Sequence, residues 1–188
     1  MNDIIAGIHE HLARFWPNNR KEAFVWDLGP IRETLPNWQV IRVAPTRSGE
    51  PWQYVTVGAS SIASNGEGGL EFILSAPEED PIHIETLAMV SNFHADPRYR
   101  VHYGKVIDIG RPWVDDSRST HFLVSHPYPQ GPDFEYCCIG GKHVRFLWLM
   151  PITSSERKYL ERNGQEALER RFEDAQINSV DPHRPSVA

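Results

Sequence analysis

The segment that decides the fold is the run His143-Val-Arg-Phe-Leu-Trp-Leu-Met150. It is apolar on both faces apart from Arg145, which is typical of a central strand that is covered on both sides. Residues 134–138 also favour a strand, and Gly140 and Gly141 supply turn residues between the two. The sequence therefore predicts a β-hairpin over residues 134–150.

Further strands are predicted from runs that are rich in β-branched and aromatic residues. The run 70–76 shows the strand period, because Leu70, Phe72 and Leu74 recur at every second position and indicate one buried face. Residues 64–69 precede it as a glycine-rich turn. Outside the hairpin, the predicted strands are residues 24–26, 38–43, 52–57, 70–76, 106–109 and 122–125.

Helices are predicted from apolar spacing and from capping residues. Residues 4–16 carry apolar side chains at helical spacing, and a proline follows them. Asp80, which precedes a proline, begins a second helix that ends before the next Asp-Pro pair. Thr153 and Glu156 form a capping box that begins a third helix, and Gly164 interrupts it.

These elements predict an α+β fold in a single domain, with a mixed, mostly antiparallel sheet that is flanked by helices. Residues 1–37 are expected to form an N-terminal helix and loop that pack on the domain, and residues 38–188 to form the domain itself. The length of 188 residues fits one domain that buries roughly 70% of its extended surface without a disulfide or a metal.

The charge balance and the hydropathy pattern disfavour several classes of protein. With 19 Lys and Arg against 25 Asp and Glu, the net charge is −6. This charge disfavours nucleic-acid binding, which requires a clustered basic surface. No run approaches the roughly 20 apolar residues of a membrane span, and the N-terminus lacks the basic start and apolar core of a secretory signal.

Cys137 and Cys138 are the only cysteines of the chain. Because adjacent cysteines are poorly placed for a normal disulfide and no Cys-x-x-Cys motif is present, a reduced, cytoplasmic setting is expected. The two side chains should alternate between the faces of the predicted strand, so that one of them is buried. A nucleophilic cysteine would require a basic partner, which the sequence alone does not place.

The nine histidines raise the alternative of a metal-dependent enzyme. Four of them, His94, His102, His121 and His126, lie in the middle of the chain, where they are candidates for convergence on a metal. None belongs to a His-Glu-x-x-His motif, and none accompanies a cysteine pair with ligand spacing. We therefore favour histidines that are exposed or hydrogen-bonded, and we expect neither a metal nor a cofactor.

Two proline-braced loops carry the candidate binding residues. Arg111-Pro-Trp113 and the segment 125–132 hold large aromatic side chains in rigid backbone, and Trp, Tyr and Arg are the residues that most often anchor interfaces. The predicted partner-binding residues are Tyr103, Asp108, Arg111, Trp113, His126 and Tyr128. In the structural alternative, Trp113 and Tyr128 cover the end of the sheet and Arg111 pairs with Asp108.

Five distinctive strings occur in the chain: Gly69-Leu-Glu-Phe, Val90-Ser-Asn-Phe-His-Ala95, Val101-His-Tyr-Gly-Lys-Val-Ile-Asp-Ile-Gly-Arg-Pro-Trp113, Ser125-His-Pro-Tyr-Pro, and Val144-Arg-Phe-Leu-Trp-Leu-Met-Pro-Ile-Thr153. Together they resemble the bacterial branch of the Suppressor of fused family. The similarity covers residues 38–188, and this range includes the tail at 181–187.

The resemblance implies a protein-binding domain without enzyme activity. The animal member of the family regulates Hedgehog signalling by clamping a transcription-factor peptide as an added β-strand between two domains, and this chain resembles only the first of them. Bacterial members are expected, from genomic context, to act as immunity proteins that neutralise toxins. The expected partner is therefore a protein or peptide, and an acidic chain suits a basic toxin.

Overall fold

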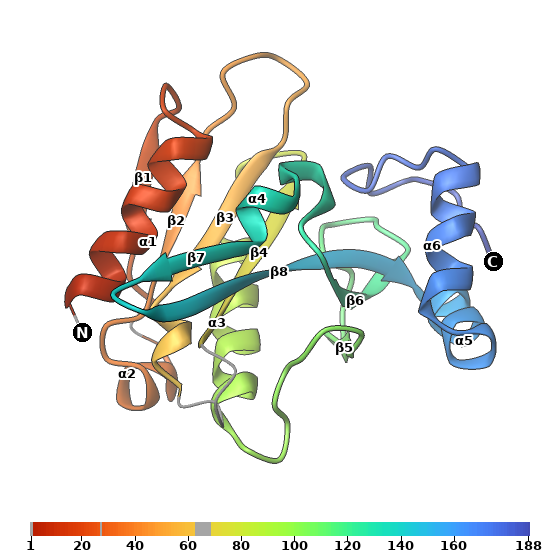
Figure 1. Cartoon of the computed structure of the whole chain (residues 1–188). Coiled ribbons are helices and arrows are strands. Elements are labelled where there is room, and N and C mark those ends of the chain that lie inside the picture. Colours follow the sequence, from red (N-terminus) through yellow and green to blue (C-terminus); the bar gives the residue numbers. More distant parts are fainter. Residues whose placement is uncertain (1, 27, 63–68) are drawn as a thin grey trace. The chain divides into compact units, whose positions relative to one another are not determined.

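The computed structural model describes residues 2–26, 28–62 and 69–188 of the chain (Figure 1). The backbone falls into two compact units. Unit 1 comprises Met1–Val101 and His126–Trp148, and unit 2 comprises His102–Ser125 and Leu149–Ala188. Each unit therefore combines segments that are distant in the sequence.

The sheet of unit 1 is antiparallel through its first four strands and parallel at the next pairing. Strands β1 to β4 pair in sequence order, and β4 pairs in parallel with β8. Strand β7 forms an antiparallel hairpin with β8. The bounds are β1 Lys21–Phe24, β2 Gln39–Val43, β3 Trp52–Val57, β4 Gly69–Ala76, β7 Tyr136–Ile139 and β8 Lys142–Thr153. The predicted α+β class and mixed, mostly antiparallel sheet are confirmed.

Unit 2 holds the last residues of β8 and two further strands. Strands β5 (Val106–Asp108) and β6 (Ser119–Ser125) are antiparallel, and β6 is the neighbour of β8 in the strand order. Helices α5 (Ser154–Asn163) and α6 (Gln165–Asp174) follow β8 and pack against each other. Gly164 separates them at a φ of 83°, so the predicted interruption is confirmed.

Two long helices belong to unit 1. Helix α1 (Asn2–Phe15) runs beside β7 (Figure 1), and a Cβ added at Gly7 would lie 2.6 Å from Cγ1 of Ile139. Helix α3 (Ile82–Ala95) packs on β3 and β4, and the Asp80 carboxylate accepts a hydrogen bond of 2.8 Å from the N–H of Ile82. The short helical turns are α2 (Ile31–Thr34), η1 (Ala59–Ser61), η2 (Tyr128–Gln130) and α4 (Pro132–Glu135).

An aromatic cluster around His11 joins α1 to the hairpin. The His11 ring is buried and stacks on Phe146 with 5.1 Å between ring centroids, while Phe15 and Phe134 lie at 5.0 and 5.4 Å. Its Nε2 lies 3.0 Å from the carbonyl oxygen of Phe134. Burial lowers the pKa of His11; the bond to Phe134 opposes this shift and the charge of Arg14 adds to it. The neutral imidazole is therefore the form that the fold favours.

The boundaries of two predicted strands are wrong. Residues 134 and 135 belong to the helical turn α4, because Gly131 adopts a φ of 85° and Pro132 then starts a turn before β7 begins at Tyr136. The first strand lies at Lys21–Phe24 instead of residues 24–26, since its pairing with β2 sets the register.

Other boundaries differ by a few residues. Strand β8 continues to Thr153, three residues beyond the predicted end, and β6 begins at Ser119, three residues before the predicted start. The predicted turn at residues 64–69 lies outside the described residues except for its last glycine. The predicted division of the chain at residue 38 stays a prediction.

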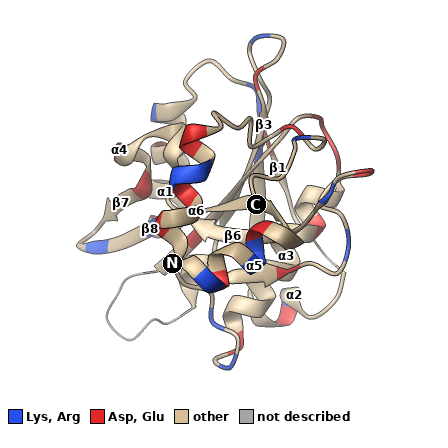
Figure 2. Cartoon of the chain, turned by 90° about the vertical axis from the view of Figure 1, so that its right-hand side faces the viewer, with Lys and Arg blue, Asp and Glu red and all other residues tan. Residues whose placement is uncertain are grey.

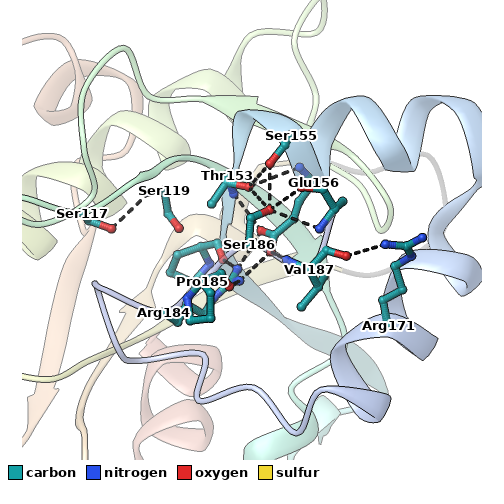
Figure 3. A network of polar contacts seen from close by, with 12 residues as sticks. Ser117, Ser119, Thr153, Ser155, Glu156, Arg171, Arg184, Pro185, Ser186 and Val187 are labelled. Carbon is teal, nitrogen blue, oxygen red and sulfur yellow. Dashed lines mark hydrogen bonds and ion pairs between the residues drawn. The ribbon is translucent and has the colours of Figure 1, made fainter.

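The predicted capping box lies within a larger polar network in unit 2 (Figure 3). Thr153 Oγ1 accepts a hydrogen bond from the N–H of Glu156, and the Glu156 carboxylate accepts one from the N–H of Thr153. Arg184, from the C-terminal tail, donates to both carboxylate oxygens of Glu156 at 2.6 and 2.8 Å. Burial raises the pKa of Glu156, but the guanidinium and the backbone donors outweigh burial and lower it. A buried ion pair thus fixes the tail.

We expect Trp148→Ala to lower the free energy of unfolding by roughly 3–5 kcal/mol, the usual cost of deleting a large buried aromatic side chain. Trp148 is 4% exposed on the buried strand β8. His143→Ala, at the exposed start of the same strand, should change it by no more than about 0.5 kcal/mol. Urea unfolding of the two variants measures both values, and equal stabilities would contradict the burial of β8.

We also expect His11 to make the protein less stable as the pH falls. Because the folded-state pKa of His11 lies below its value in the unfolded chain, the unfolded state binds the proton more readily. The contribution is therefore present above about pH 6.5, the ordinary histidine pKa, and is lost on acidification below it. Urea unfolding across this range should show a flatter pH dependence for His11→Phe than for the wild type. His9→Phe, exposed on the same helix, serves as the control, and an equal flattening by this variant would contradict the assignment to His11.

Candidate functional site

Unit 1 carries a cluster of two exposed tyrosines and three half-buried polar side chains that we name the Tyr128–Tyr136 surface. It consists of His126, Tyr128, Glu135, Tyr136 and Arg145. Tyr128 and Tyr136 are 58% and 51% exposed, which is high for large aromatic side chains. Tyrosine and arginine are the residue types that most often dominate binding energy in protein interfaces.

The Glu135 carboxylate organises this surface. Its Oε1 accepts a hydrogen bond of 2.8 Å from Nε of Arg145 and lies 3.0 Å from Nδ1 of His126. The guanidinium of Arg145 lies over the Tyr136 ring at 5.5 Å from the centroid. The His126 and Tyr128 rings meet edge to face with 5.7 Å between centroids. The two tyrosines are thus attached to one charged cluster, which restricts their side chains before any partner arrives.

Local backbone explains how the sequence assembles this surface. In the hairpin register Tyr136 lies opposite Arg145, so that the two side chains share one face. Gly131, at a φ of 85°, separates η2 from α4 and thereby brings Glu135 back toward His126. The prolines of the segment 127–132 restrict the backbone between them.

A groove of about 470 Å³ also lies in unit 1. Two of its lining residues, Pro129 and Gln130, directly follow Tyr128 in the chain. The amide of Gln130 donates to Oε1 of Gln53 at 3.2 Å, and that oxygen also accepts from Ser75 at 2.7 Å. The groove is lined by Phe15, Trp16, Asn19, Val43, Ala44, Pro45, Thr46, Glu50, Pro51, Gln53, Pro129 and Gln130. Its aromatic and proline lining is of the kind that receives extended peptides.

The predicted partner-binding residues fall in both units. His126 and Tyr128 lie in unit 1, whereas Tyr103, Asp108 and Arg111 lie in unit 2. Asp108, on strand β5, has a side chain that is 63% exposed and lies 3.6 Å from Nε2 of buried His121. The Arg111 guanidinium donates to the neighbouring carbonyl of Pro112 at 3.0 Å.

Trp113, the remaining predicted residue, is 1% exposed. The backbone N–H of Trp113 donates to the carbonyl of Ser119 at 3.0 Å, which connects the loop to β6 within unit 2. This burial favours the structural alternative for Trp113. Tyr128, the aromatic residue of the other proline-braced loop, is exposed.

Three members of the Tyr128–Tyr136 surface are not among the residues that the sequence predicts: Glu135, Tyr136 and Arg145. The sequence predicts a strand at Glu135, in which the carboxylate would point away from the face of Tyr136. Arg145 stands out in the sequence only as the one polar residue in an apolar run. The cross-strand pairing of Tyr136 with Arg145, counted back from the turn at residues 140–141, was the signal that could have joined them.

The four middle histidines have separate local partners, and that of His126 is Glu135. His94 Nδ1 accepts from the N–H of Val101 at 3.2 Å, and His102 Nδ1 lies 2.8 Å from the carbonyl of Tyr103. Nδ1 of His121 lies 2.9 Å from the hydroxyl of Thr120, and its Nε2 lies 3.3 Å from Arg157. Among the described residues, no three His, Cys, Asp or Glu side chains are grouped as a metal site.

Charges of both signs alternate along the helices of unit 2. Figure 2 shows Lys and Arg interspersed with Asp and Glu on α5 and α6, so these helices present no single-signed basic stripe of the kind that binds nucleic acid. Within the described part of the chain, every helix is too short or too polar to cross a bilayer.

Two comparisons with known proteins indicate the same family. The family model described as Suppressor of fused protein (SUFU) matches residues 35–185. A solved structure of a Suppressor of fused homologue from Neisseria gonorrhoeae is 40% identical in sequence, with a TM-score of 0.89. The similarity covers 100% of this chain and 98% of the Neisseria chain.

Two further solved structures have the same fold at 13% identity. One is described as the Sufu–Fu complex, with a TM-score of 0.73 over 98% of this chain and 92% of that chain. The other is Drosophila Suppressor of Fused, with a TM-score of 0.71 over 98% of this chain and 51% of that chain. A comparison with curated proteins produced no match. The family model and the Neisseria relative show that the chain belongs to the Suppressor of fused family.

Proposed function

We propose that this chain is a non-enzymatic protein-binding domain that regulates or neutralises a protein partner in the cytoplasm. The observation that carries the proposal is the Tyr128–Tyr136 surface, which exposes two tyrosines around a fixed arginine. The family supports it, because one member with this fold was crystallised as a Sufu–Fu complex. The histidine geometry offers no comparable support for an enzyme.

The exposed tyrosines suit a hot spot because they lose little freedom on binding. Tyr136 lies on a paired strand, and the Arg145 guanidinium lies over one face of its ring. Tyr128 packs against His126 in a proline-braced turn. A partner would therefore bury two large rings at a low entropic cost. Glu135 already neutralises part of the local positive charge, so a partner need not supply an acidic group to satisfy Arg145.

Strand addition is the mode of capture that we propose. Strand β5 is the last in the strand order, and its one pairing among the described strands is with β6. Its outer edge thus offers backbone N–H and C=O groups to an extended peptide. Asp108 ends this strand, and Tyr103 and Arg111 flank it in the chain; all three would contact the side chains of the added segment.

We further propose that the partner is a polymorphic toxin and that the chain is its immunity protein. The net charge of −6 supports this role, because an acidic inhibitor attracts a basic enzyme and accelerates their encounter. Affinity isolation from the native cell, read by mass spectrometry, tests it. Recovery of a toxin that the chain inactivates would support the role, whereas a host regulator as the bound protein would contradict it.

We expect Tyr128→Ala and Tyr136→Ala each to weaken binding of the isolated partner by about 2 kcal/mol, or roughly 30-fold. Tyr99→Ala is the matched control, because Tyr99 is also an exposed tyrosine of unit 1 (46%) but packs against Phe93, outside the proposed surface. Calorimetric titration measures the three affinities. An equal loss in all three variants, or none in the first two, would rule out the Tyr128–Tyr136 surface.

We expect Trp113→Ala to act on stability, in contrast to Tyr128→Ala. Deleting the buried indole should lower the free energy of unfolding by roughly 3–5 kcal/mol, while removing the exposed Tyr128 ring should change it by about 1 kcal/mol or less. Urea unfolding provides both values. A stable Trp113→Ala variant that had lost partner binding would return Trp113 to the binding surface.

A further inference from the structure

The hairpin of β7 and β8 carries a cysteine and a histidine in direct contact. Cys138 and His143 are cross-strand partners, and Sγ of Cys138 lies 3.1 Å from Nδ1 of His143. Both residues are exposed. A thiol within hydrogen-bonding reach of an imidazole is the arrangement that activates cysteine as a nucleophile. This pair has no place in the proposed binding function.

The neighbouring cysteine lies in a contrasting environment. Cys137 is buried against helix α1, where its thiol donates to the carbonyl oxygen of Gly7 at 3.8 Å. Burial raises the pKa of the Cys137 thiol, and the charge of Cys138 raises it further. Since alternate residues of a strand face opposite sides, the two thiols differ in access and in partner although they adjoin in sequence.

The surroundings of Cys138 can accommodate an attached anionic group. A cavity of about 520 Å³ between α1 and β7 is lined by both cysteines and by Glu10 and Arg14, among other residues. On the hairpin itself, Lys142 is the exposed neighbour of His143, and Arg145 lies two residues beyond His143 on the same face of the strand. Space is therefore available beside the thiol, and the hairpin carries two positive charges near it.

We propose that Cys138 is a modification site that forms a mixed disulfide with a small anionic disulfide such as glutathione disulfide, and that His143 activates it. The thiol proton of Cys138 passes to Nδ1 of His143. The thiolate attacks one sulfur of the disulfide, the original S–S bond breaks, and a new S–S bond joins Cys138 to one half. The other half leaves as a thiolate and takes up the proton, so that Cys138 is oxidised while the small disulfide is reduced.

Incubation of the full chain with glutathione disulfide, followed by intact-mass analysis and peptide mapping, tests the site. We expect one glutathionyl group per chain, on Cys138, which a reducing agent removes. Cys138→Ser should abolish the adduct and Cys137→Ser should leave it unchanged. Equal labelling of the two cysteines, or an adduct on Cys137 alone, would overturn the assignment of the site.

The rate of the reaction tests the role of His143. Native Cys138 should react faster than the same thiol in the urea-unfolded chain, and His143→Ala should slow the native reaction about tenfold. Lys142→Ala is the matched control, because it removes a positive charge from the adjacent exposed position and keeps the imidazole. An equal slowing by Lys142→Ala, or a native rate no higher than the unfolded rate, would contradict activation by His143.

Discussion

The constraint on which the rest of the structure depends is the burial of strand β8. Every residue from position 146 to 153 is buried. A strand that is covered on both faces must satisfy its backbone groups through neighbouring strands, and β8 does so with β4, β7 and β6. Only its first residues emerge, and His143 and Arg145 there meet Cys138 and Tyr136 of β7. The exposed polar contacts of the hairpin therefore lie at the end of β8 where this strand leaves the core.

Among the described residues, each unit also buries one carboxylate, and the two are compensated differently. In unit 1 the Glu71 carboxylate is surrounded by donors: the hydroxyl of Thr56 and the N–H groups of Gly58, Ala59 and Ser60, at 2.6 to 3.3 Å. These donors hold the turn η1 in place, yet burial still raises the pKa of Glu71. In unit 2 the guanidinium of Arg184 supplies a full opposite charge to Glu156, and the pKa is lowered.

Much of the fold was predictable because its signals are local. The strand at residues 52–57 and the capping box at Thr153 follow from patterns that span a few positions, and both are confirmed. The helical turn α4 was not predicted, because residues 134 and 135 have strand-like neighbours and the turn depends on the backbone of Gly131. Of the candidate site, His126 and Tyr128 are predicted from the proline-rich loop that carries them. The contribution of Arg145 required the hairpin register, and the burial of Trp113 required the tertiary structure, because an aromatic residue in a proline-rich loop has the same local pattern in either setting.

The ion pair between Glu156 and Arg184 has a consequence for the order of events during synthesis. The two residues are separated by 28 positions in the chain, so at about 5–20 residues per second the ribosome needs a few seconds to reach the arginine after it has added the glutamate. Until then the carboxylate has no guanidinium, and burying it alone would be costly. The start of α5 must therefore remain hydrated while the segment between is made. Folding of unit 2 around Glu156 is thus delayed until the tail has left the ribosome, well after most of unit 1 has been translated.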